Sequence, residues 1–277
     1  MKTCFSTLSC PDWSWNRVVD EAALLGFDGI EPRVVDGGLD LVHAAPFQPD
    51  RIEETKRRLV ELDLAIPCLG SGVAFHDITR YDAALEEGLG CITLAQRLGA
   101  PYVRVFGDRL PTGAERAETL ERIARGIRTL CRACEGTGVT ILQETHGDFS
   151  HADPLMEVAA RVDDPHYGIL WDIEHTFHAH GEDLSGFLAG SWPLVRHVHI
   201  KDSRTVDGAT RPCLTGTGDV PVRSILSLLR RLGYNDFLSL EWEKKWHPEI
   251  EEPDIALPDY LAFLANAEDT EKGHALR

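Results

Sequence analysis

Long apolar runs are absent from the sequence. No stretch approaches the ~20 apolar residues that a membrane-spanning helix requires, and the start, Met1 to Phe5, lacks the apolar core of a signal peptide. These two absences argue against a membrane protein and against a secreted one. The protein is therefore expected to work in the cytoplasm, without a membrane partner.

Positive charge is scarce. Lys and Arg number 28 against 45 Asp and Glu, which gives a formal net charge of −17 at pH 7. Such a charge repels a phosphate backbone, and no basic face or stripe interrupts it. Short basic runs at 56–58 and 230–231 fall within amphipathic patterns, where a solvated helix face explains them. We expect no nucleic-acid partner.

Paired cysteines are lacking as well. The seven cysteines are odd in number and scattered, which fits reduced thiols better than a disulfide framework. Cys131 and Cys134 form a C-x-x-C, but they lie in a helical pattern with no second cysteine pair or histidine pair nearby. They are interpreted as core or helix-surface residues and not as a zinc site.

No Pro/Gly/Ser-rich linker divides the 277 residues, so one domain over 1–277 is expected. Short β-like runs alternate with longer helical patterns, which is typical of βα units around a parallel sheet. The expected strands are 3–8, 29–33, 65–69, 102–106, 139–144, 168–172, 195–200 and 237–242. The expected helices are 15–25, 50–62, 81–98, 114–135, 154–162, 184–188, 222–232 and 257–267.

Eight units of roughly 35 residues predict a fold of the α/β class, a single (β/α)₈ TIM barrel. An open, doubly wound sheet is the alternative. That fold usually has a glycine-rich phosphate loop after its first strand, whereas residues 9–13 here are Ser-Cys-Pro-Asp-Trp. The barrel is therefore the better interpretation.

Acidic and histidine residues fall at the ends of four expected strands: Glu144, Asp172, His199 and Glu241. In a barrel the carboxyl ends of the strands converge on one mouth, so these side chains should meet there. Three carboxylates and one imidazole suit a hard or borderline divalent ion. The sequence predicts one such ion per chain; Mn²⁺ is the expected ion, and Mg²⁺, Co²⁺ and Zn²⁺ also fit.

Five segments carry a resemblance to a known family. They are QETH at 143–146, WDIEH at 171–175, HVHIKD at 197–202, GTGDVP at 216–221 and LEWE at 240–243. In this order the chain resembles the xylose isomerase-like TIM-barrel superfamily, which includes ketose 3-epimerases, hydroxypyruvate isomerase, inosose dehydratase and, more distantly, apurinic endonuclease. The resemblance covers nearly the whole chain.

The resemblance implies a metal-dependent isomerase or epimerase that acts on a small sugar. It makes the same four residues the metal ligands, makes His175 a substrate contact, and implies that Glu144 and Glu241 also move the proton. A ketose chelated by the metal would then react through an enediolate, and return of the proton to the opposite face of the same carbon is epimerisation. The residue six positions after Glu144 is Ser150, where the epimerases have a second acidic residue.

Several roles stay open at this point. A basic residue after His199 is expected to bind substrate, with Lys201, Arg204 and Arg211 as candidates. His146 and His175 could bind substrate or only orient a ligand. Glu31 and Arg33 could form an ion pair in the barrel mouth or touch substrate, and His197 is expected to point away from the barrel interior. The oligomeric state is open, and a homo-oligomer is compatible with the sequence.

Three other functions are weighed against the first. A dehydratase of the inosose or dehydroshikimate kind would begin with the same proton abstraction and then lose water. An apurinic endonuclease would need three zinc ions, further histidines on strands 2 to 4 and a basic face, none of which the sequence shows. A non-catalytic metal-binding or sugar-binding barrel gains no support from an intact set of four ligands.

Overall fold

The computed structural model describes residues 1–113, 115–181 and 183–275. Its central feature is a sheet of eight parallel strands in the order β2-β1-β10-β7-β6-β5-β4-β3. The strands are β1 (Lys2–Ser6), β2 (Gly29–Glu31), β3 (Cys68–Ala74), β4 (Tyr102–Phe106), β5 (Thr140–Glu144), β6 (Tyr167–Asp172), β7 (Val195–Ile200) and β10 (Phe237–Leu240). A parallel bridge between Gly29 and Ala65 joins the two edges. The sheet is thus a nearly closed barrel, as predicted.

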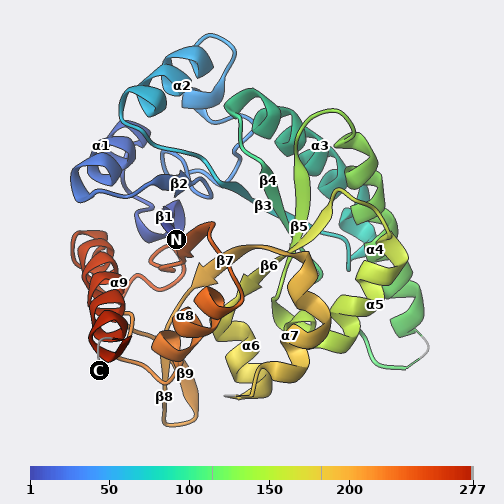
Figure 1. Cartoon of the computed structure of the whole chain (residues 1–277). Helices are drawn as coiled ribbons and strands as arrows, with labels where there is room; N and C mark the ends of the chain where they lie inside the picture. The colour runs from blue at the N-terminus through green and yellow to red at the C-terminus, as the bar shows by residue number, and fades with distance from the viewer. Residues whose placement is uncertain (114, 182, 276–277) are drawn as a thin grey trace.

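Helices form the outer ring around these strands (Figure 1). They are α1 (Trp15–Leu25), α2 (Ile52–Glu61), α3 (Tyr81–Leu98), α4 (Glu115–Ala133), α5 (Ala152–Val162), α6 (Ile173–His180), α7 (Ser185–Ser191), α8 (Val222–Arg231) and α9 (Pro253–Ala275). The C-terminal helix α9 lies next to α1. In the described part of the chain, no helix combines the length and the apolar character needed to pass through a bilayer.

Glycine ends two of the predicted helices. Gly26 after α1 and Gly99 after α3 have φ angles of 85° and 75°, in the left-handed region where a residue with a Cβ is strained. Both amides donate to carbonyls of the last helical turn. The caps therefore fix where the chain leaves each helix and turns back toward the barrel.

Several elements differ from the sequence expectation, and α9 begins four residues earlier and ends eight residues later than predicted. Strand β3 begins three residues later than predicted and runs through Gly70 and Gly72, because Pro67 has no amide proton to donate to a ladder. Helix α6 follows β6 directly and was not predicted, because eight residues are too few for a clear helical period. An antiparallel hairpin, β8 (Ser203–Val206) and β9 (Ala209–Pro212), interrupts the connection to α8 and was also missed.

The barrel interior has an apolar layer below a polar one. Leu142 and Leu170 pack with Cys68 inside the barrel, with Tyr102 against them. Residues two apart on a strand share a face, so the residues two positions after these leucines, Glu144 and Asp172, also point inward. The larger apolar cluster joins the outer face of the strands to the helices. Interior side chains near the carboxyl ends of the strands are therefore polar.

All seven cysteines are free, which confirms the prediction of reduced thiols. Cys131 and Cys134 are fully buried in the core, in agreement with their interpretation as core residues. Burial is also the main cause that raises the pKa of the Cys134 thiol to about 12. These thiols are therefore protonated packing residues.

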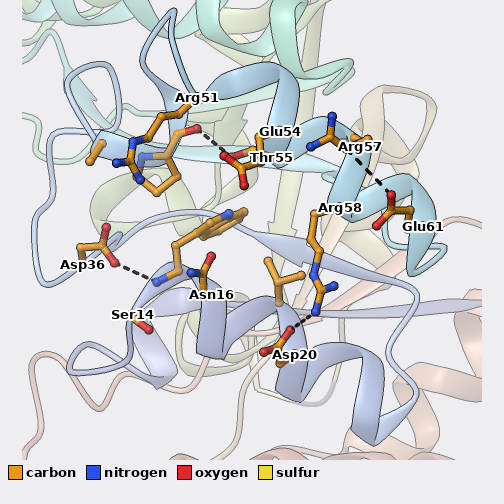
Figure 2. Close-up of a pocket in the computed structure, with 14 residues that line it drawn as sticks. Ser14, Asn16, Asp20, Asp36, Arg51, Glu54, Thr55, Arg57, Arg58 and Glu61 are labelled. Atoms are coloured by element: carbon orange, nitrogen blue, oxygen red, sulfur yellow. Dashed lines mark hydrogen bonds and ion pairs between the residues drawn. The ribbon is translucent and has the colours of Figure 1, made fainter.

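A groove of about 680 Å³ lies on the outer ring between α1 and α2 (Figure 2). Charged side chains from both helices flank it, and the pair Arg58–Asp20, at 2.7 Å, joins the two helices along one side. Exposed ion pairs of this kind contribute little stability. The groove lies outside the barrel, away from the acidic residues at the strand ends.

Close packing of α4 on Phe75 generates a stability prediction. A Cβ on Gly126 would lie 2.4 to 2.6 Å from atoms of the buried Phe75 ring, so Gly126→Ala should destabilise the protein by about 1–3 kcal/mol. The matched control is Gly186→Ala in α7, where no atom lies within 4 Å of the new Cβ; its stability should change by about 1 kcal/mol or less. Urea unfolding measures both, and equal stabilities of the two variants would contradict the packing argument.

Candidate metal centre

Four ionisable side chains meet at the carboxyl ends of the strands. Glu144 ends β5, Asp172 ends β6, His199 lies in β7 and Glu241 comes directly after β10. Asp172 and His199 are paired across neighbouring strands. One ligand atom from each of the four lies within 4.8 Å of the others, and all four residues are buried. The barrel therefore brings together the four residues that the sequence marks as ligand candidates.

His199 Nδ1 is the centre of this group. It lies 3.4 Å from Glu241 Oε1, 3.9 Å from Glu144 Oε1 and 4.0 Å from Asp172 Oδ2. Three carboxylate oxygens from three strands thus point at the same imidazole nitrogen. His199 Nδ1 and these three oxygens are called the inner atoms of the site below.

The second carboxylate oxygen of Asp172 is held by backbone amides. Oδ1 accepts hydrogen bonds from the amides of Glu174, at 2.8 Å, and His175, at 3.0 Å, so Asp172 is the N-cap of α6. Oδ2 has no hydrogen-bond partner among the residues that the structure describes. The cap thus fixes the carboxylate with its second oxygen toward the centre, where Lys201 Nζ lies 3.4 Å from it.

Buried cations hold the outer oxygens of the two glutamates. Arg104 Nη1 donates to Glu144 Oε2 at 2.5 Å, and Lys201 Nζ donates to Glu241 Oε2 at 2.8 Å. Both cations are almost completely buried, where such charge-assisted hydrogen bonds are strong. Burial alone raises the pKa of the Glu241 carboxyl, but the charges of Lys201 and His199 outweigh it and hold that pKa well below its usual range.

The other ring nitrogen of His199 contacts Glu31, at the end of β2. His199 Nε2 lies 3.1 Å from Glu31 Oε1, and His197 Nε2 lies 2.9 Å from Glu31 Oε2. His197 therefore points into the barrel, and the expectation that it faces away is wrong, because residues two apart on a strand share a face. Glu31 pairs with these histidines, and no ion pair joins it to Arg33, although the structure describes both side chains.

The donor set fits a divalent cation. Asp172 Oδ2 and His199 Nδ1 are buried and have no hydrogen-bond partner within the described ranges. Burial raises the pKa of the Asp172 carboxyl; the charge of Lys201 lowers it, and the negative charges of Glu241 and Glu174 raise it further. Buried carboxylates that repel one another in this way are what a cation at their common centre would stabilise. Three oxygens and one imidazole nitrogen suit a hard or borderline ion.

Three basic residues after His199 are candidates to bind substrate. Of these, Lys201 lies in this group of side chains. Besides Glu241 it contacts Asp172, at 3.4 Å, and Glu243, at 3.4 Å, and its Nζ lies 3.4 Å from His175 Nε2. The structure places the buried Lys201 ammonium among carboxylates.

The other predicted substrate-binding residues divide into two groups. The rings of His146 and His175 are in edge contact at 4.8 Å, beside Lys201. Arg204 and Arg211 are paired on the hairpin β8–β9, where both are exposed, and Arg204 donates to the Thr217 carbonyl. The structure therefore does not bring Arg204 to the four ligand candidates.

Sequence reasoning gave no role to Arg104, Glu174 or Glu243. Arg104 left a signal, because it is a charged residue in the middle of the apolar strand Tyr102–Phe106, at an inward position shared with the strand's two end residues. A buried Arg is almost always paired, so an acidic partner could have been expected. Its identity as Glu144 could not, since 40 residues separate the two.

Comparison with known proteins identifies the family of this barrel. A sequence model of the family described as "Xylose isomerase-like TIM barrel" matches residues 19–265. The chain belongs to this family. No curated protein sequence matches this xylose isomerase-like barrel.

Solved structures with the same fold include three informative ones. The probable 3-DHS dehydratase AsbF from Bacillus anthracis is 21% identical, with a TM-score of 0.74 over 88% of this chain and 93% of that one. A D-tagatose 3-epimerase-like protein is 18% identical, with a TM-score of 0.78 over 99% and 100% of the two chains. The IOLI protein with a binding zinc atom is 17% identical, with a TM-score of 0.79 over 96% and 98%. At these identities, the similarity to the three structures shows only that the folds are alike.

The setting of His175 generates a pH prediction. Burial lowers the pKa of its imidazole, and the charges of Lys201 and His146 lower it further, to about 3. An unfolded histidine takes up a proton near pH 6.5, so below that pH the unfolded state binds more protons and stability falls as pH falls toward 3. From pH 7 to pH 5, metal-free wild type should therefore lose about 2 kcal/mol more stability than His175→Gln.

Urea unfolding at both pH values in the presence of a chelator measures this difference. Equal losses in wild type and His175→Gln would show that His175 takes up its proton in the folded state, against the prediction.

Proposed function

We propose that this protein is a divalent-metal-dependent isomerase or epimerase of a ketose or keto-sugar. The ion would be held by Glu144, Asp172, His199 and Glu241, with Mn²⁺ as the expected metal. The observation that carries the proposal is the convergence of their inner atoms on one point, with Asp172 Oδ2 and His199 Nδ1 left without hydrogen-bond partners in the described parts of the chain. Buried carboxylates that converge on one point repel one another, and a divalent cation at that point would remove the repulsion.

The proposed chemistry is removal and return of a proton next to a carbonyl. A bound divalent cation would act as a Lewis acid on the carbonyl oxygen and stabilise the charge of the enediolate. Glu144 and Glu241 stand on β5 and after β10, on different sides of the barrel mouth, so one can take the proton and the other can return it. Return to the same carbon gives the epimer, and return to its neighbour gives the isomer.

The remaining side chains support these steps. The lowered pKa of Glu241 keeps its carboxylate ionised, which a general base requires. His175 is uncharged at neutral pH, and its ring can donate a hydrogen bond to a substrate oxygen or accept one from it. Arg104 and Lys201 hold the glutamates in place and need not touch the sugar. The partner of the protein is thus a small-molecule sugar.

A dehydratase is the second candidate, because it uses the same proton abstraction. A protein described as a probable 3-DHS dehydratase, AsbF, has the same fold. The two functions differ in the step after the abstraction: an epimerase returns the proton, whereas a dehydratase expels a hydroxyl group as water. Loss of water from the product therefore distinguishes them.

The first test is metal content. Protein stripped by a chelator, reloaded with Mn²⁺ and dialysed should hold one ion per chain, whereas the double variant Asp172→Asn with His199→Ala should hold less than a tenth of that. The matched control is Asp40→Asn with His43→Ala, an exposed Asp–His pair at 2.8 Å on the surface. Elemental analysis measures all three. Equal manganese in both double variants would refute the ligand assignment.

The second test is solvent exchange. A ketose that the enzyme turns over in D₂O should acquire deuterium on the carbon next to the carbonyl, because a carboxylate that removes a proton exchanges it with solvent. Glu241→Gln should slow this exchange at least 100-fold, as expected for loss of a general base, while the circular dichroism spectrum stays unchanged. Mass spectrometry and NMR detect the label.

Two results would redirect the proposal. An isomer without solvent deuterium indicates a hydride shift between neighbouring carbons, which uses no glutamate base. Deuterium uptake together with loss of water from the product indicates the dehydratase.

A further inference from the structure

Glu31 is a buried carboxylate that crosses the interior of the barrel. It stands at the end of β2, which is separated from β7 by β1 and β10 in the sheet. Its oxygens nevertheless reach both histidines of β7, and its side chain is 1% exposed. The contact joins residues 168 positions apart in the sequence. Such a bond exists only because the sheet closes into a barrel.

Three side chains lie within hydrogen-bond distance of this carboxylate, and each can donate a hydrogen bond to it. Ser239 Oγ, from β10, donates to Glu31 Oε2 at 2.8 Å. His197 Nε2 lies 2.9 Å and His199 Nε2 3.2 Å from the same oxygen, and His199 Nε2 lies 3.1 Å from Oε1. An ionised carboxylate only accepts, so each imidazole must carry a proton on Nε2. The hydrogen bond to Glu31 therefore determines which nitrogen of His199 is protonated.

The two nitrogens of His199 then have different tasks. With the proton on Nε2, a neutral imidazole has its lone pair on Nδ1. Nδ1 is the atom that faces Glu144, Asp172 and Glu241 and has no hydrogen-bond partner among the described residues. A proton on Nδ1 would occupy the position that a metal ion needs. Glu31 thus excludes the tautomer that cannot ligate.

We propose that Glu31 is the positioning residue of the metal centre: by accepting the Nε2 proton of His199, it directs the Nδ1 lone pair at the ion. The inference rests on the proposed function, in which the four residues hold a metal. Glu31 does not touch the ion or the sugar. It acts through His199, and Ser239 and His197 hold it in the orientation that this requires.

The test compares metal binding in wild type and Glu31→Gln. A glutamine has one acceptor and one donor group, so it cannot accept protons from both histidines and the serine at once. Its amide donor would force one imidazole to present a bare Nε2 and to move its proton to Nδ1. Mn²⁺ affinity, measured by calorimetry, should fall about 10-fold to 100-fold, the usual effect of losing such an outer partner.

Ser239→Ala is the matched control. It removes a donor to Glu31 but leaves both histidine contacts, so its Mn²⁺ affinity should stay within about threefold of wild type, well short of the loss expected for an outer partner. Unfolding of the metal-free variants in urea separates a loss of affinity from a loss of fold. A purely structural Glu31 would change the unfolding midpoint and leave the affinity of the folded protein unchanged.

A spectroscopic measurement decides the question even if Glu31→Gln does not fold. In the ¹⁵N-labelled wild type loaded with Zn²⁺, His199 should show a ring proton on Nε2 that is protected from exchange, and an Nδ1 without a proton. A ring proton on Nδ1 would overturn the proposal.

The outcomes separate this inference from the proposed function. If wild type and Glu31→Gln bind Mn²⁺ equally, the positioning role fails and the metal centre stands. If wild type binds no Mn²⁺, the metal centre fails, and the role of Glu31 fails with it.

Discussion

The rest of the site depends on four buried polar side chains, each of which has two polar atoms with different surroundings. One atom of Glu144, Asp172, His199 and Glu241 points to a common centre, and the other is held by a partner. The partners are chemically distinct: a buried Arg104 and Lys201, the first amides of α6, and the carboxylate Glu31. Buried polar groups without partners are costly, so this outer set makes an acidic interior compatible with a stable fold.

The barrel supplies this arrangement by bringing distant strands to one end. A (β/α)₈ barrel separates stability from function, because apolar contacts on the outer face of the strands and a small apolar layer inside hold the fold. The carboxyl ends of the strands are then free to carry charge. Lys201 shows the consequence: its ammonium is buried among carboxylates that come from β6 or from the segment after β10.

Much of this could be predicted from the sequence, for a physical reason. Alternating short apolar runs and helical patterns predict the barrel, because in each βα unit the helix buries its apolar face against the strands. The four ligand candidates were identified because all barrel strands run parallel and end at one mouth. The short helix α6 and the hairpin β8–β9 were missed, since neither is long enough to leave a period, and strand β3 was shifted because its glycines resemble a loop.

The sequence by itself determined the number and order of the barrel strands, most of the helices and the residue types at the strand ends. Only the tertiary structure decided the partners: that Arg104 meets Glu144, that Lys201 meets Glu241, and that Glu31 reaches across two strands to His199. Period-2 alternation assigns a side chain to the inside of the barrel, and for His197 it corrects the first expectation. It cannot say which inward side chains touch, because that depends on strand stagger and closure, which arise when all eight strands are in place.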